Sequence, residues 1–208
     1  MNEFSVAGCI RFGWETFKKR PWFLIGVTAL FLVASWVAGA VGGAFGNNGL
    51  PAAAGGIVNA GLSMLLSMGI TAFFLHANDA IENVPVGDLW HPRPFWKFVG
   101  ATILSGIVIV VGLLLLIVPG IIFSLMFLFT SYIVIDRNLG PVKAMKESKR
   151  ITKGHRGKLL GLLLAVAGLN ILGIMVIVVG LLVSIPVTSL AMMHAYRTLT
   201  RMAPPAAA

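Results

Sequence analysis

The chain has 208 residues, of which 58% are hydrophobic and only 11% are charged. A soluble globular domain carries charged side chains at about 25% of its positions, so this composition excludes an ordinary soluble protein. The formal net charge is +9, from 16 Lys and Arg against 7 Asp and Glu. A chain that is both apolar and basic is typical of a protein embedded in a membrane.

The charged residues fall into four clusters, and they are absent from residues 21–78, 98–135 and 159–196. Since ionised side chains are costly inside a bilayer, these three stretches are predicted to lie in a membrane. About 20 residues of helix cross a hydrocarbon core of about 30 Å, so each stretch is long enough to cross twice. The sequence therefore predicts an all-α membrane protein with six transmembrane helices, arranged as three hairpins.

The expected elements begin with an amphipathic helix over residues 1–20, which suits the membrane interface. The six spans are expected at 22–45, 56–76, 98–117, 119–135, 158–178 and 181–199. Because Pro, Gly and Asn interrupt helices, the turns within the hairpins are predicted at Asn47–Pro51, Val118–Gly120 and Val179–Gly180. Residues 202–208 are expected to be a disordered tail, and the whole chain, 1–208, is predicted to be one membrane domain.

A second surface helix is predicted between the fourth and fifth spans, over residues 141–152. It opens at Pro141 and closes before Gly154, which are residue types favoured at helix starts and ends. Its weak apolar face consists of Ala144, Met145, Ser148 and Ile151.

The basic residues predict the orientation of the chain. All 16 Lys and Arg lie in the four clusters, and the predicted loops on the opposite side contain none. An even number of spans separates each cluster from the next, so all four clusters face one side of the membrane. The positive-inside rule assigns that side to the cytoplasm. We therefore expect both termini and both surface helices to be cytoplasmic.

No enzyme chemistry is visible in the sequence. The four histidines have no metal-ligand spacing, and no acid pairs with a His or Ser in a known catalytic signature. The three stretches expected inside the membrane also contain no charged side chain, which argues against an ion-driven pump. We expect a protein without catalytic activity, cofactor or metal.

The most informative segment for function is the basic one at 143–158. Its basic residues are Lys143, Lys146, Lys149, Arg150, Lys153, Arg156 and Lys158, and a smaller cluster consists of Lys18, Lys19 and Arg20. Basic residues beside a membrane attract anionic headgroups by about 1 kcal/mol each. We predict a non-enzymatic protein that binds anionic lipid at its cytoplasmic face, in a lipid-organising or scaffold role. The alternative is that these residues only set the topology. Nucleic acid is not an expected partner, because the segment has little aromatic interleaving.

A different function is suggested by a polar stripe on the second span. The stripe consists of Asn59, Ser63, Ser67 and Thr71, which recur every four residues and so share one helix face. They would line a pathway in a passive transporter or channel for a small or lipid-like solute. In the alternative, they hydrogen-bond between neighbouring helices. A homo-oligomer is compatible with either function, and the sequence does not indicate which proteins are partners.

Several motifs of the second half occur together in one known family. They are Pro119-Gly120-Ile121, Tyr132–Asp136, Gly140–Lys146, Ser148, Ile151–His155, Gly180–Pro186 and Ala195–Arg197. Over this half, the chain resembles uncharacterised bacterial six-span integral membrane proteins related to the membrane domain of some glycerophosphodiester phosphodiesterases. The resemblance implies six helices with both ends inside, in the bacterial cytoplasmic (inner) membrane. It implies no catalysis, because the phosphodiesterase domain has no counterpart here.

Overall fold

The structure is a computed structural model that describes residues 4–45, 49–79, 94–175 and 179–203. Within these ranges it contains helices and no strands, which confirms the predicted all-α class. The helices are α1 (Val6–Lys19), α2 (Pro21–Gly43), α3 (Gly49–Asp79), α4 (Phe95–Leu115), α5 (Ile117–Phe127), α6 (Thr130–Arg137), α7 (Pro141–Thr152), α8 (Arg156–Met175) and α9 (Val179–Met202). The expected tail at 202–208 falls outside the described residues from 204 onwards.

Helix α7 has the bounds that the sequence predicts, but all three predicted turns overlap the starts of helices. Val179 and Gly180 open α9, and the part of the first turn at Asn47 and Asn48 lies outside the described residues. Helix α3 already begins at Gly49, so Pro51 of the expected loop lies in its first turn. The turn between α4 and α5 is the extended residue Leu116, and Pro119 lies in the first turn of α5. The first turn of a helix tolerates proline, because its N–H groups have no helical partner there. The two prolines therefore start helices instead of ending them.

The expected span at 119–135 is divided into α5 and α6 by a break at Leu128 and Phe129. Ser148 of α7 bridges the break. Its hydroxyl donates to the carbonyl oxygen of Met126 at 2.8 Å and accepts from the Phe129 N–H at 3.2 Å. Buried backbone groups need a hydrogen-bond partner, and here a side chain from another helix supplies it.

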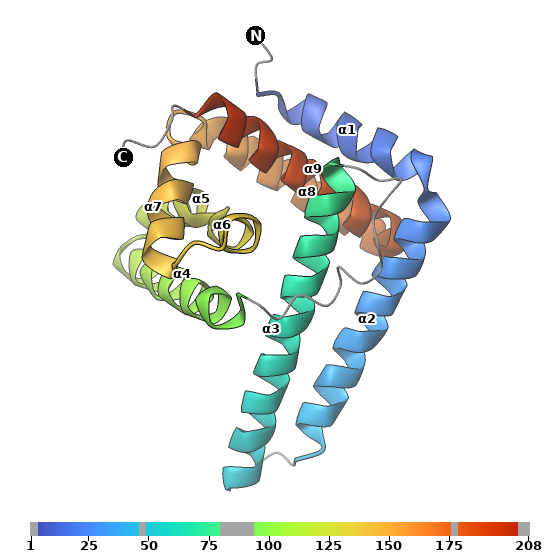
Figure 1. The fold of residues 1–208 in the computed structure, drawn as a ribbon, viewed down its shortest axis with the longest axis vertical. Helices are drawn as coiled ribbons and strands as arrows, with labels where there is room; N and C mark the ends of the chain where they lie inside the picture. Colours follow the sequence, from blue (N-terminus) through green and yellow to red (C-terminus); the bar gives the residue numbers. More distant parts are fainter. Residues whose placement is uncertain (1–3, 46–48, 80–93, 176–178, 204–208) are drawn as a thin grey trace.

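Helix α9 is the centre of the fold, because α1, α2, α3, α7 and α8 all pack against it. Figure 1 shows α1 and α8 running beside it. Leu190, Ala191, Ala195 and Tyr196 of α9 are completely buried. The core is therefore built around the last described helix of the chain.

Helix α1 packs along α9. At the contact, a Cβ atom on Gly13 would lie 2.4 Å from the carbonyl oxygen of Val187, so only glycine allows the two backbones to approach this closely. The opposite face of α1 carries an exposed ion pair, in which Arg11 Nε lies 2.7 Å from Glu15 Oε1. The expected amphipathic helix is thus present, and its inner face is covered by protein.

Five helical segments in the described ranges are long and apolar enough to cross a membrane. They are Pro21–Gly43, Gly49–Asp79, Phe95–Leu115, Ile117–Arg137 and Arg156–Met175. This finding supports a multi-pass membrane protein. The expected sixth span, in α9, is not among these segments, and α9 contains Pro186 in its interior.

The pairs of neighbouring helices are steeply inclined to one another. Helices α2 and α3 form a long antiparallel pair that runs across the direction of α8 and α9 (Figure 1). At the far end of this pair, a Cβ atom on Gly55 would lie 2.3 Å from the carbonyl oxygen of Gly42. The side chains around this end are apolar and exposed, for example Leu50 at 87% and Trp36 at 76%. Such a surface suits contact with lipid and not with water.

Candidate functional site

The basic helix α7 is docked onto the protein by its small and apolar side. Ala144, Ser148, Ile151 and Thr152 are buried against neighbouring helices, among which are α4, α5, α6 and α9. The Thr152 hydroxyl donates to the carbonyl oxygen of Ser148 at 2.9 Å, so this buried oxygen has a partner. The face predicted from the sequence is therefore the face that binds the rest of the protein. Docking fixes which side of α7 remains free.

Four exposed lysines lie on the other side of α7 and directly after its last residue, Thr152. They are Lys143, Lys146, Lys149 and Lys153, which we call the α7 lysines. Among the residues that the structure describes, none of the four side chains makes a hydrogen bond or an ion pair. Their charges are therefore not neutralised by the described parts of the chain. Lys158, in the first turn of α8, is also exposed, whereas Arg156 is partly buried.

The only acid of the basic segment, Glu147, is neutralised by two arginines. Arg150 donates from Nε to Glu147 Oε2 at 2.8 Å, and Arg137 of α6 donates from Nη1 to Oε1 at 2.8 Å. The hydrogen bonds from Arg150, supported by the charge of Arg137, hold the pKa of Glu147 below its ordinary value. Arg150 is thus engaged in this structural pair. The exposed cations of the segment are the lysines.

The second basic cluster that the sequence singled out lies away from the α7 lysines. The ring of Phe4 contacts the ring of His155 at 6.1 Å, which brings the start of α1 to the loop between α7 and α8. Lys18, Lys19 and Arg20 lie at the other end of α1, about 20 Å along a helix of this length. The structure therefore does not bring the two clusters together.

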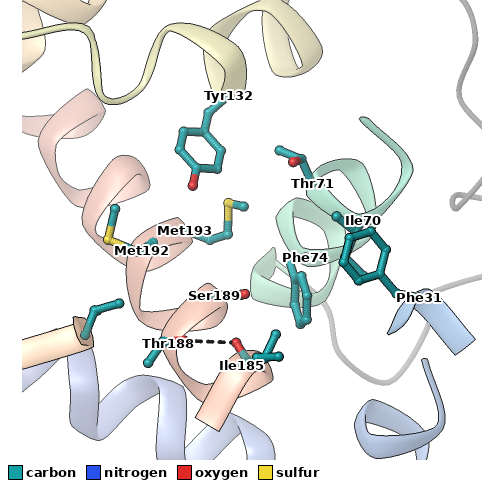
Figure 2. A pocket seen from close by; sticks show the side chains of 11 residues that line it. Phe31, Ile70, Thr71, Phe74, Tyr132, Ile185, Thr188, Ser189, Met192 and Met193 are labelled. Carbon is teal, nitrogen blue, oxygen red and sulfur yellow. Dashed lines mark hydrogen bonds between the residues drawn. The ribbon is translucent and has the colours of Figure 1, made fainter. Parts of the chain in front are cut away.

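A cavity of about 220 Å³ lies between α2, α3, α6, α8 and α9 (Figure 2). Most of its lining is apolar, from Phe31, Ile70, Phe74, Val166, Ile185, Met192 and Met193. The polar side chains are those of Thr71, Tyr132, Thr188 and Ser189. Figure 2 shows the Tyr132 hydroxyl pointing into this space. A cavity of this size can hold a small apolar group, since a dry cavity of about 150 Å³ binds benzene.

The cavity contains only one residue of the predicted polar stripe, Thr71. The hydroxyl of Thr71 donates to the carbonyl oxygen of Ser67 at 2.6 Å, and that of Ser67 donates to the carbonyl oxygen of Ser63 at 2.7 Å. Asn59 lies farther along α3, where its side chain faces Gly42 of α2. The described structure does not gather the four residues around one channel. A solute pathway stays a prediction.

Sequence reasoning missed one polar cluster, in which α9 is joined to α3 and α6. Arg197 donates to Asp79 Oδ2 at 2.6 Å from Nη2 and to Asp136 Oδ1 at 2.9 Å from Nη1. The Tyr196 hydroxyl donates to Asp136 Oδ2 at 2.8 Å. A signal for the cluster exists in the sequence, because each of its three charged residues borders a charge-free stretch. Borders of different stretches meet when the predicted hairpins pack together.

The helices from α4 to α9 have a counterpart among known families. Residues 96–203 match a family described as protein of unknown function, DUF975. This match shows no relation to the membrane domain of glycerophosphodiester phosphodiesterases. No curated protein and no solved structure matches the chain.

Proposed function

We propose that this chain, which belongs to the DUF975 family of proteins of unknown function, binds anionic lipid headgroups through the α7 lysines. In this proposal the protein is not an enzyme. It organises lipid, or serves as a scaffold, at the cytoplasmic face of the bacterial inner membrane. The lysines attract phosphate groups electrostatically, and the apolar helices hold α7 beside the headgroups.

The observation that carries this proposal is the separation of roles within α7. Its buried side fixes the helix on the protein, and Glu147 is paired with Arg137 and Arg150. The α7 lysines are exposed and have no partner among the described residues. Unpaired surface lysines are available for an external anion.

We also propose that the chain crosses the membrane six times, with α9 as the sixth span and both termini in the cytoplasm. The support is the charge pattern, because all 16 Lys and Arg lie in clusters separated by even numbers of expected spans. Helix α9 is less apolar than α2, α3, α4 and α8. This is compatible with the proposal, because other helices pack around α9 and its polar residues need not face lipid.

The test of lipid binding is a double charge reversal, Lys146→Glu with Lys149→Glu. Native mass spectrometry and lipid extraction measure the ratio of anionic to zwitterionic phospholipid retained by the purified protein. Two lysines contribute about 2 kcal/mol together at about 1 kcal/mol each, so we expect anionic lipid to bind at least tenfold more weakly.

The matched control is Lys146→Arg with Lys149→Arg, which keeps the charge at both positions. We expect this variant to retain the wild-type lipid ratio, because the attraction is electrostatic. An unchanged ratio in the glutamate variant would show that the basic segment only sets topology and would overturn the proposal.

A further inference from the structure

A polar pocket of about 460 Å³ lies between α1, the end of α3 and the end of α9. Its lining includes Phe12, Asn78, Asp79, His194, Thr198 and Arg201. None of the α7 lysines lines it. The pocket is therefore separate from the lipid-binding surface proposed above.

One face of α9 forms a wall of this pocket. His194, Thr198 and Arg201 are spaced by four and three residues, so their side chains leave the helix on the same side. The ring of Phe12 stacks on the ring of His194, with ring centres 4.0 Å apart and planes inclined by 19°. This stack joins α1 to α9 and closes one side of the pocket.

The charged groups in the pocket are not all available to a ligand. The Arg197 guanidinium donates to both carboxylate oxygens of Asp79, at 3.1 and 2.6 Å, and Nη1 donates to Asp136. Arg201, in contrast, is exposed and has no partner among the described residues. The guanidinium of Arg201 is therefore the available cation among the described residues of the pocket, and its planar fork suits a phosphate group.

Three further polar groups in the pocket lack a partner in the described parts of the chain. The Asn78 side-chain oxygen is shielded from solvent and accepts no hydrogen bond. The Thr200 hydroxyl is shielded as well and makes no hydrogen bond. The Thr198 hydroxyl, which is only partly buried, makes none either. Shielded polar atoms normally have partners, since leaving one unpaired costs about 1–3 kcal/mol. The pocket thus offers a free donor side at Thr198 and Arg201 and a free acceptor at Asn78.

We infer that this pocket binds a phosphodiester whose other end carries a hydrogen-bond donor, as in the ethanolamine or glycerol headgroup of a phospholipid. Arg201 and Thr198 hold the phosphate, and the Asn78 oxygen accepts from the ammonium or hydroxyl group. Basic pockets between helices on the cytoplasmic side bind lipid headgroups in this way. The inference rests on the proposed function, because it assumes that the ends of α3 and α9 lie at the cytoplasmic membrane surface.

The first experiment measures binding of short-chain phospholipids to the full chain in detergent, by calorimetry. The probes are phosphatidylethanolamine, phosphatidylglycerol and phosphatidylcholine. The choline headgroup has the same phosphate but neither an N–H nor an O–H donor. We expect ethanolamine or glycerol lipid to bind at least tenfold more tightly than choline lipid. Equal binding of all three would overturn the inference.

The second experiment identifies the residues. Arg201→Gln and, separately, Thr198→Val should each weaken the preferred lipid, with a loss of at least tenfold for Arg201→Gln. Arg11→Gln, at an exposed arginine on the outer face of α1, is the matched control and should leave this binding unchanged. Circular dichroism confirms that each variant is folded. Unchanged binding in the folded Arg201→Gln and Thr198→Val variants would overturn the inference.

Two outcomes separate the pocket from its surroundings. Suppose that the variant Lys146→Glu with Lys149→Glu loses its preference for anionic lipid but still binds the ligand of the polar pocket. Both proposals are then supported independently. If that preference survives in the α7 variant while Arg201→Gln loses its ligand, the proposed function fails and the pocket stands. Glycerophosphoethanolamine, which has no acyl chains, distinguishes the source: binding as tight as that of the lipid supports the pocket and assigns a soluble ester to it.

Discussion

Ser148 illustrates how a single hydroxyl determines the course of the backbone. It is fully buried and joins α7 to the break between α5 and α6 through one donated and one accepted hydrogen bond. Without the hydroxyl, the Phe129 N–H and the Met126 carbonyl oxygen would both lose this partner. The residue therefore couples the basic helix to the fourth candidate membrane segment.

We expect Ser148→Ala to destabilise the protein by about 1–3 kcal/mol, the usual cost of leaving buried polar groups unsatisfied. Thermal unfolding in detergent, followed by circular dichroism, measures the effect. Ser124→Ala is the matched control, because the Ser124 hydroxyl donates only to the carbonyl oxygen of Gly120 in its own helix. Equal melting temperatures for the two variants would contradict the assigned role of Ser148.

The contact between α1 and α9 depends on one glycine and is best tested as a contact between elements. Gly13 has no room for a Cβ atom, since Val187 and Ala191 lie against it. Gly26 of α2 has open space around it, because a methyl group added there would meet nothing within 4 Å. Comparing alanine substitutions at the two positions therefore separates the cost of a steric clash from the gain in helix propensity.

We expect Gly13→Ala to destabilise the fold by about 1–3 kcal/mol, as overpacking does in other cores. Gly26→Ala should be neutral or stabilising by up to about 1 kcal/mol, because alanine favours helix over glycine. Thermal unfolding of the two variants decides. A Gly13→Ala variant as stable as Gly26→Ala would show that α1 does not dock closely on α9.

At the level of elements, the features that depend on residues close together in the chain could be predicted from the sequence. The bounds of α7 and its buried face followed from Pro141, Gly154 and the spacing of small and apolar residues. The break before α6 could not be predicted, because its partner Ser148 is 19 residues away from Phe129. The turns predicted at Pro51 and Pro119 were wrong for a different reason, since a proline interrupts a helix only beyond its first turn.

At the level of the whole molecule, the sequence predicted the all-α class and the membrane character. The charge-free stretches contain most of each of the five candidate membrane segments. The cavity and the polar pocket could not be predicted, because each combines residues from three or more helices. The separation of the two basic clusters could not be predicted, because it depends on how α1 packs along α9.

The proposed topology is tested by labelling single cysteines in intact bacterial cells with a membrane-impermeant maleimide. We expect Leu50→Cys to react from outside, and Lys153→Cys and Met202→Cys to react only after permeabilisation. The wild-type chain is the control. Its only cysteine, Cys9, is buried, and burial raises the pKa of the thiol to about 11.

One outcome would contradict the topology in a specific way. Helix α1 packs along α9, and its outer face carries the exposed ion pair between Arg11 and Glu15. A charged outer face suits a helix at the membrane surface, so the arrangement to be distinguished is one in which α9 also lies along that surface. If α9 lies along the membrane surface instead of crossing, Met202→Cys will react from outside in cells whose Lys153→Cys does not. The labelling pattern therefore distinguishes six crossings from five.

The central position of α9 also bears on how the protein is made. The ribosome releases α9 after all the other described helices, yet five of them pack against it. Until it emerges, the surfaces of α1, α2, α3, α7 and α8 that it covers have no partner within the nascent chain. Assembly of these helices around their common partner is therefore completed only after the last part of the fold has been synthesised.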